Sequence, residues 1–145
     1  MWHEIVNEDD INRLMDTFGE FHDGCIKELK YISGAFVDER LSMYPLDREQ
    51  RLNIIVQRQY KNPSVIEMEF IGLIHLNMFP GDENYDGIIF GATMIKGDNC
   101  IYWCDGDSLS KSELDSYEGT LICASKVRWR VADEYIGEAE VYTAR

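Results

Sequence analysis

The residues with the clearest chemical potential are a histidine and an aspartate that are adjacent in the sequence, His22 and Asp23. A carboxylate beside an imidazole can orient a general base or a metal ligand. Neighbouring side chains on a regular strand point to opposite faces, so we expect these two side chains not to touch each other. Two interpretations stay open: a small enzyme or metal-dependent protein that uses His22 and Asp23 with nearby carboxylates or Cys25, and a structural role at a helix–strand junction.

A second candidate is the tetrapeptide at residues 106–109, which spells G-D-S-L. It resembles the motif of the GDSL lipases and esterases, in which the serine is the nucleophile and an aspartate and a histidine near the C-terminus complete the triad. Here Ser108 also follows an expected strand, but the last histidine of the chain is His75. Because no C-terminal base is present, we expect Ser108 not to act as a nucleophile.

Two expected loops are rich in carboxylates. Residues 82–87 match the first half of an EF-hand calcium loop, in which alternate oxygen ligands converge on the cation and a glycine makes the turn. The twelfth position, where a bidentate glutamate belongs, is Thr93, so we expect an acidic turn and no calcium site. Five carboxylates of the two loops could form an electronegative patch for a basic protein partner: Asp82, Glu83, Asp86, Asp105 and Asp107.

A row of cations marks the last long expected strand. Lys126, Arg128 and Arg130 alternate with apolar residues, so they project from one face of that strand. In a chain this acidic they need counter-charges, and Glu67 and Glu69 on another strand are the natural cross-strand partners. The alternative is that the three cations form an anion site or a partner site.

Motifs for cofactors and metals are missing from the sequence: it has no P-loop, no G-x-G-x-x-G, no H-E-x-x-H and no C-x-x-C. Cys100 and Cys104, if both lie on one strand, have Cα atoms about 13 Å apart, which is too far for two ligands of one zinc ion. We therefore expect them to be reduced, buried thiols, and we expect no cofactor.

One helix followed by strands must position these candidates. The helix is predicted from an apolar stripe at i, i+3, i+4 and i+7: Ile11, Leu14, Met15 and Phe18. Asn7 is suited to cap its start and Gly19 to end it. Beyond this point the apolar period falls from about 3.6 residues to 2, which is typical of strands.

The strand pattern covers most of the remaining chain. Segments with this pattern are residues 25–31, 51–57, 66–78, 88–95, 100–104, 121–131 and 140–143. We expect Cys25, Leu29 and Tyr31 to share a face, Gly72 to make a bulge, and residues 88–95, apolar on both faces, to form a central strand. The predicted fold is α+β: a short N-terminal helix packed on a mostly antiparallel sheet of about six or seven strands, either open or a partial barrel.

Length and composition predict a single domain over residues 1–145, because 145 residues with 45% hydrophobic content can bury a core. No apolar run approaches the roughly 20 residues that span a bilayer, and the N-terminal residues lack the pattern of a signal peptide. We therefore expect a cytoplasmic protein. The net charge of −13 opposes attraction to nucleic acid or anionic lipid, so we expect neither nucleic acid nor a membrane as partner.

The stretch at residues 18–25 reads F-G-E-F-H-D-G-C and runs into an alternating strand. It resembles a family of small bacterial proteins that have an F-H-D motif between a short helix and a β-rich body, some of which are similar to immunity proteins of polymorphic toxin systems. Here Phe21, His22 and Asp23 carry the resemblance, which implies a bacterial source and a non-enzymatic binding role. The first hypothesis is thus an acidic module that binds a basic protein. The second is the enzyme or metal-dependent protein at His22 and Asp23, and the third is a homodimer through the sheet edges without a ligand.

Overall fold

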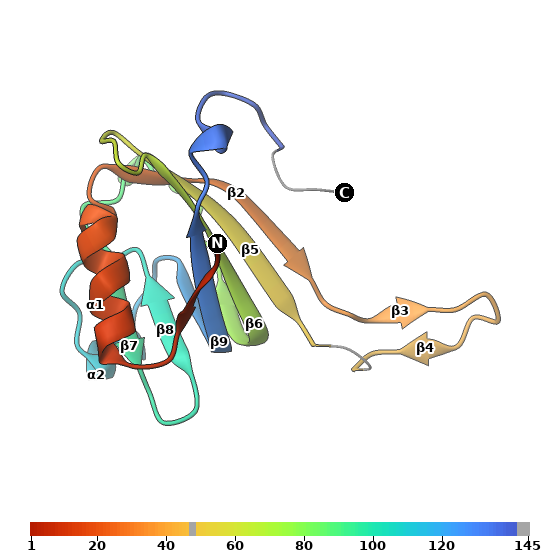
Figure 1. Ribbon diagram of the computed structural model, residues 1–145. Coiled ribbons are helices and arrows are strands. Elements are labelled where there is room, and N and C mark those ends of the chain that lie inside the picture. Colours follow the sequence, from red (N-terminus) through yellow and green to blue (C-terminus); the bar gives the residue numbers. More distant parts are fainter. Residues whose placement is uncertain (47–48, 142–145) are drawn as a thin grey trace.

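A curved antiparallel sheet forms the frame of the computed structural model, which describes residues 1–46 and 49–141 (Figure 1). The helices are α1 (Glu8–Thr17) and the one-turn α2 (Lys111–Leu114), and two 3-10 turns are η1 (Gly19–Phe21) and η2 (Asp133–Tyr135). The strands are β1 (His3–Ile5), β2 (Gly24–Ile32), β3 (Phe36–Val37), β4 (Met43–Tyr44), β5 (Arg51–Arg58), β6 (Val65–Asn77), β7 (Thr93–Lys96), β8 (Ile101–Cys104) and β9 (Leu121–Val131).

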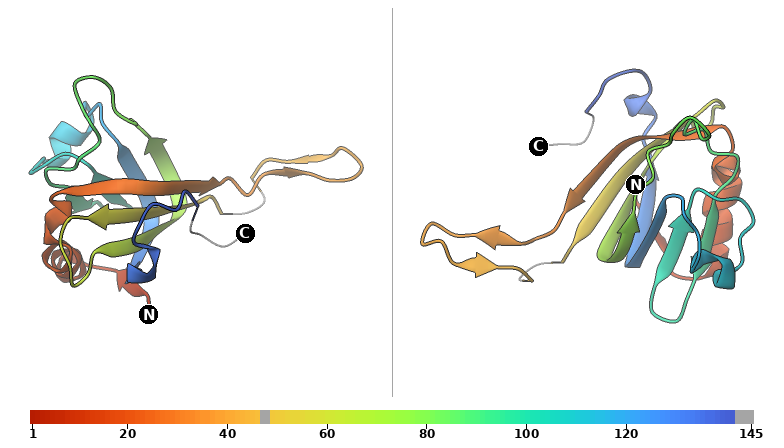
Figure 2. Two further views of the ribbon diagram at one scale, coloured as in Figure 1. Left: turned by 90° about the horizontal axis from the view of Figure 1, so that it is seen from above. Right: turned by 180° about the vertical axis from the view of Figure 1, so that it is seen from behind.

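The strand order confirms the predicted α+β class and selects the open form of the sheet. Strands pair in the order β2-β5-β6-β9-β8-β7, and β1 pairs with the second half of β9. The terminal strands β2 and β7 do not pair with each other, so the sheet is not a barrel. β3 and β4 form a separate two-stranded hairpin that projects from the rest of the molecule (Figures 1 and 2). None of the helices in the described residues is long and apolar enough to cross a lipid bilayer.

Helix α1 begins and ends where the sequence predicts. Asp10 N donates to Asn7 Oδ1 at 3.0 Å, and Asn7 N donates to the Asp10 carboxylate at 3.2 Å, so the two residues cap each other. Gly19 has a φ of 57°, which ends the helix. Ile11 and Leu14 are buried in the main core, which α1 closes over one face of the sheet. The residues that the sheet contributes to this core include Leu52, Ile54, Val56, Ile66, Met68, Phe70, Val127 and Trp129.

The central strand predicted at residues 88–95 is wrong. The strand β7 begins only at Thr93 and lies at the edge of the sheet, and residues 87–92 are irregular. The bulge predicted at Gly72 lies further along β6, between Leu73 and His75. Of the strand predicted at residues 140–143, the first two residues are not in a strand and the last two lie outside the described residues.

The predicted face of β2 is also wrong. The register of β2 against β5 shifts between Ile26 and Glu28, so the alternation of sides changes there. As a result Ile26 and Leu29 both pack against the core, while Cys25 is exposed. Of the two cysteines expected to be buried, Cys104 is buried and Cys100 is half-buried, and both are free thiols.

Candidate functional site

A strained turn between α1 and β2 carries the F-H-D motif. Gly19, Glu20, Phe21 and Asp23 all have positive φ angles. Only glycine adopts this conformation without a cost, so contacts must hold the other three in place. The Phe21 ring does so from inside: it is fully buried and packs edge-on against Trp103 at a centroid distance of 5.4 Å.

Backbone hydrogen bonds join this turn to the segment before β7. Asp23 N donates to Ile89 O and Ile89 N donates to Gly24 O, each at 2.8 Å. Ala92 N donates to Glu20 O at 2.8 Å. The backbone groups of Ile89 and Ala92 are thus hydrogen-bonded to the turn between α1 and β2 and are not available to a neighbouring strand. This explains why the segment before β7 is not the expected strand.

The turn brings the His22 and Asp23 side chains together, so the expectation that they do not touch is wrong. His22 Nε2 lies 3.3 Å from Asp23 Oδ2, and His22 Nδ1 lies 2.7 Å from Phe90 O. The reason is the left-handed φ of 58° at Asp23, which a regular strand does not have. A general base or metal ligand needs a ring nitrogen whose lone pair faces the substrate or metal, and both nitrogens of His22 face oxygen atoms of this chain.

A surface groove of about 480 Å³ opens beside this turn. Three carboxylates and two apolar side chains are among its lining residues, and we call this set the acidic groove: Asp23, Glu83, Asp86, Ile88 and Phe90. Phe90 is 82% exposed and Ile88 is 48% exposed. Among the described residues, no lysine or arginine forms an ion pair with any of the three carboxylates. The groove therefore combines uncompensated negative charge with exposed apolar surface.

The first acidic loop is a tight turn in which backbone N–H groups donate to the aspartate side chains of the same loop. Asp82 Oδ1 accepts hydrogen bonds from Asn84 N at 2.7 Å and from Tyr85 N at 3.1 Å. Asp86 Oδ1 accepts a hydrogen bond from Ile88 N at 3.0 Å. Within residues 1–46 and 49–141, no three His, Cys, Asp or Glu side chains are grouped so that they could hold a metal ion. The carboxylates of this loop thus shape the turn, and Glu83 points its charge to solvent.

Asp105 joins the two acidic loops. Its Oδ2 accepts a hydrogen bond from the Tyr85 hydroxyl at 2.9 Å, and its Oδ1 accepts from the Tyr117 hydroxyl and from Thr120 N. Burial, followed by the hydrogen bonds to Asp105, raises the pKa of both tyrosine hydroxyls well above its usual value. The loops therefore do meet in space, but Asp105 is half-buried and holds them together, whereas the carboxylates of the first loop are exposed.

Asp107 and Ser108 lie on the exposed part of the second loop. Ser108 Oγ donates to Asp107 Oδ1 at 3.2 Å, and in the described part of the chain no histidine hydrogen-bonds to Ser108. The Asp107 carboxylate packs against Gly91, where a Cβ atom would lie only 2.7 Å from Oδ1. This contact places Asp107 next to the segment that carries Phe90, so it belongs to the same negatively charged end of the molecule.

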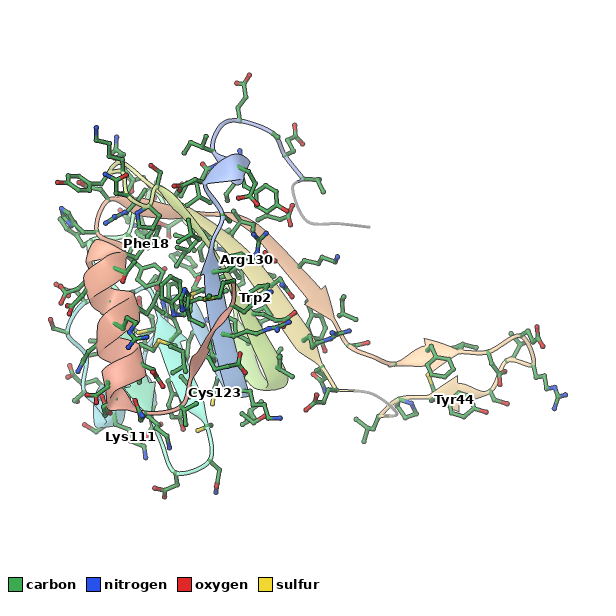
Figure 3. All side chains as sticks on the ribbon, viewed as in Figure 1. Trp2, Phe18, Tyr44, Lys111, Cys123 and Arg130 are labelled. Atoms are coloured by element: carbon green, nitrogen blue, oxygen red, sulfur yellow. The ribbon has the colours of Figure 1, made fainter. Side chains whose placement is uncertain are left out.

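The two arginines of β9 pair across the sheet as the alternation predicts. Arg128 Nε donates to Glu69 Oε1 at 2.6 Å, and Arg130 Nε donates to Glu67 Oε1 at 2.8 Å. The Trp2 ring covers both guanidinium groups, with centroid distances of 4.3 Å to Arg128 and 5.6 Å to Arg130 (Figure 3). We call Glu67, Glu69, Arg128 and Arg130 the ion-pair ladder.

The ion-pair ladder leaves little room for an external anion. Glu67 is only 6% exposed and also accepts a hydrogen bond from Asn53 at 2.9 Å, while Arg130 has a second carboxylate partner in Glu134 at 3.2 Å. Lys126 lies apart from the ladder, because the residue opposite it on β6 is Ile71. It is exposed and borders a cleft between β1 and β8.

Sequence reasoning missed the apolar part of the acidic groove. The apolar pattern predicts that Ile88 and Phe90 lie in a central strand, whereas the structure exposes both of them. The signal against a central strand was present: Gly87 and Gly91 flank the pair, and glycine weakens a strand and favours irregular backbone.

No family model, no curated protein and no solved structure matches this chain. The resemblance to immunity proteins stays a prediction. The function is therefore inferred from the geometry of the acidic groove and from the charge of the chain.

Proposed function

We propose that this protein is a non-enzymatic binding module whose acidic groove docks a basic surface of a partner protein. The observation that supports this most directly is the composition of the groove, in which three carboxylates that pair with no lysine or arginine among the described residues line the same surface as Ile88 and Phe90. Protein interfaces use an exposed aromatic side chain as an anchor and complementary charge for specificity and association rate.

The charge of the whole chain supports a basic partner. At −13, the protein attracts cationic surfaces at long range, which accelerates encounter, and repels nucleic acid and anionic lipid. A role like that of immunity proteins in the bacterial cytoplasm fits this chemistry, because a protein that occupies the cationic surface of a toxin needs negative charge and an anchor. The F-H-D motif contributes to the proposed binding surface, because the left-handed turn at Asp23 places this residue in the lining of the groove.

The alternative, an enzyme or metal-dependent protein at His22 and Asp23, has weaker support. The close contact of the two side chains favours it, but both ring nitrogens of His22 face oxygen atoms of the chain. His22 is not among the residues that line the groove. We therefore assign His22 to holding the turn against Phe90 O.

Comparative affinity capture tests the proposal. The wild-type chain, the triple variant Asp23→Asn/Glu83→Gln/Asp86→Asn and the variant Phe90→Ser are each used as bait in a lysate of the native organism. Bound proteins are eluted with a salt ramp and identified by mass spectrometry. We expect a stoichiometric basic protein that the wild type retains and both variants lose. With that protein purified, calorimetry should show an affinity for Phe90→Ser that is lower by about 30-fold.

A charge-matched control separates the groove from net charge. The variant Asp98→Asn/Glu138→Gln/Glu140→Gln also removes three negative charges, from exposed positions outside the groove. We expect it to retain the partner. If it loses the partner as completely as the groove triple variant does, only overall charge matters and the groove is not the site. A partner that all variants retain would place binding elsewhere on the chain.

A further inference from the structure

A two-stranded arm, residues 33–46, projects from the end of β2 (Figures 1 and 2). Its strands β3 and β4 pair only with each other, with Phe36 opposite Tyr44 and Val37 opposite Met43. The rings of Phe36 and Tyr44 stack at a centroid distance of 4.8 Å, and Figure 3 shows Tyr44 far from the side chains of the body. The arm is thus a small sheet of its own, outside the main core.

The tip of the arm has a specific turn. Asp38 Oδ1 accepts hydrogen bonds from Arg40 N at 2.9 Å and from Ser42 N at 3.0 Å, and Leu41 takes a left-handed φ of 65°. The hydrogen bond from Ser42 N is the main cause of the lowered pKa of Asp38. An isolated two-stranded hairpin is only marginally stable in water, so contact with another surface would stabilise the arm.

Large apolar side chains cover the arm. Those exposed to solvent are Phe36, Val37, Leu41, Met43, Tyr44 and Leu46. Leu41 is 83% exposed and Leu46 is 80% exposed. Because Phe36 is opposite Tyr44 and Val37 is opposite Met43, the first pair lies on one face of the arm and the second pair on the other, so both faces expose apolar side chains. Tyr31 and Ile32, at the end of β2 where the arm begins, are also exposed. Exposed apolar surface of this extent marks an interaction surface.

The charge distribution indicates which partner this surface fits. Residues 24–46, which comprise β2 and the arm, contain three basic and three acidic residues, so their net charge is zero. The rest of the chain carries the whole charge of −13. Two copies of the chain therefore repel each other less at this edge than over the rest of the surface taken as a whole, which attracts a strongly basic protein more than this edge does. The outer edge of β2 is also open: apart from the bridge between Gly24 and Ile89, no described strand pairs with it.

The apolar area is sufficient for a stable contact between two copies. At roughly 100 Å² for each half-exposed side chain of this size, one arm offers about 600 Å² of apolar surface. Two copies that cover both faces of each other's arm bury about 1,200 Å² from these side chains, which reaches the range of stable protein interfaces, and the edges of β2 add to this area.

We propose that the arm and the outer edge of β2 form the interface of a symmetric homodimer, with a second copy of this chain as the occupant. In a two-fold dimer both copies use the same surface. The arm and the adjacent open edge of β2 are neutral and apolar, so this surface is complementary to itself. This surface does not include the acidic groove, so each copy keeps its groove for another protein.

Sedimentation velocity of the purified full chain, from about 1 to 100 µM, tests the dimer. We expect the wild type to sediment as a species of twice the 16.9 kDa of one chain. The variant Leu41→Ser/Met43→Ser changes two exposed side chains of the arm, so it should fold normally. Its dissociation constant for the dimer should rise by about 100-fold.

The variant Ile88→Ser/Phe90→Ser is the matched control, because it removes two exposed apolar side chains from the acidic groove and should remain dimeric. A wild-type chain that stays monomeric over the whole concentration range overturns the proposal and means that the arm serves a different protein. An arm variant that dimerises as tightly as the wild type also overturns it, because the interface then lies on another surface. Neither result bears on the acidic groove, which is tested by capture of its partner.

Discussion

The ion-pair ladder on the outer face of the sheet and the acidic groove at the end of α1 both consist of charges that need a counter-charge. In the ladder, Glu67 and Glu69 are buried and each receives a short hydrogen bond from an arginine across the sheet. In the groove, Glu83 and Asp86 are exposed and have no cationic partner among the described residues. The chain thus neutralises the first group by itself and leaves the second group negative.

Burial explains the difference. Removing a carboxylate from water costs several kcal/mol, so a buried one must have its counter-charge within the same fold. An exposed carboxylate is solvated by water and can stay without a partner until another molecule supplies the cation. A charged side chain of this protein is therefore structural where it is buried and paired, and a candidate for binding where it is exposed and unpaired.

The variant Arg130→Met should cause the largest loss of stability. It removes the cation that neutralises Glu67, whose side chain is only 8% exposed, and so leaves a buried negative charge. We expect the free energy of unfolding to fall by about 3 kcal/mol. Urea titration followed by tryptophan fluorescence measures this loss.

The double variant Glu67→Leu/Arg130→Met serves as the control for that prediction. Because it removes both charges, it should recover most of the loss and remain within about 1 kcal/mol of the wild type. If Arg130→Met costs less than about 0.5 kcal/mol, the pair behaves as a surface ion pair and the contrast with the acidic groove does not hold.

A smaller loss is expected for Asp105→Asn. This carboxylate lies at the acidic end but accepts hydrogen bonds from the hydroxyls of Tyr85 and Tyr117 and from Thr120 N. An amide has one acceptor oxygen in place of two, so one of these donors loses its partner, and we expect a loss of about 2 kcal/mol in urea unfolding. The same change at the exposed Asp107 should cost less than about 0.5 kcal/mol. Equal losses at the two positions would contradict the structural role of Asp105.

Local and periodic signals predicted the helix and the ladder. The capping pair of Asn7 and Asp10 acts within one helical turn, so it can be recognised without any knowledge of the fold. The ladder depends only on the alternation of sides along two strands, which the sequence shows directly at Arg128 and Arg130. Glu67 and Glu69 alternate with apolar residues in the same way. When the two strands pair, the glutamates and the arginines therefore lie opposite each other on one face.

The acidic groove could not be predicted because it depends on contacts between distant parts of the chain. The positive φ of Asp23 is held by hydrogen bonds to Ile89, and these bonds in turn prevent residues 88–92 from forming a strand. Apolar alternation alone therefore assigned Ile88 and Phe90 to a core in which they do not lie. The arm was missed for a related reason: nothing local in the sequence shows that Met43 and Tyr44 pair back onto Phe36 and Val37.

The smallest effect on stability is expected for the groove triple variant, Asp23→Asn/Glu83→Gln/Asp86→Asn. None of these side chains makes an ion pair with a described lysine or arginine, and the amide oxygen of an asparagine at position 86 can still accept the hydrogen bond from Ile88 N. The free energy of unfolding should therefore change by less than about 0.5 kcal/mol, a surface effect. Relief of mutual repulsion between carboxylates favours a small gain at low salt that disappears as salt screens the charges.

Urea titrations of the groove triple variant and the wild type, at low and at moderate salt, measure the change in the free energy of unfolding and its dependence on salt. A loss of more than about 1 kcal/mol would mean that the carboxylates hold the strained turn together and that the groove, like the ladder, is structural. Unchanged stability combined with loss of the partner in the capture experiment would separate the two roles. It would mean that the chain maintains negative charge at this end for a second molecule, because its own fold makes no use of it.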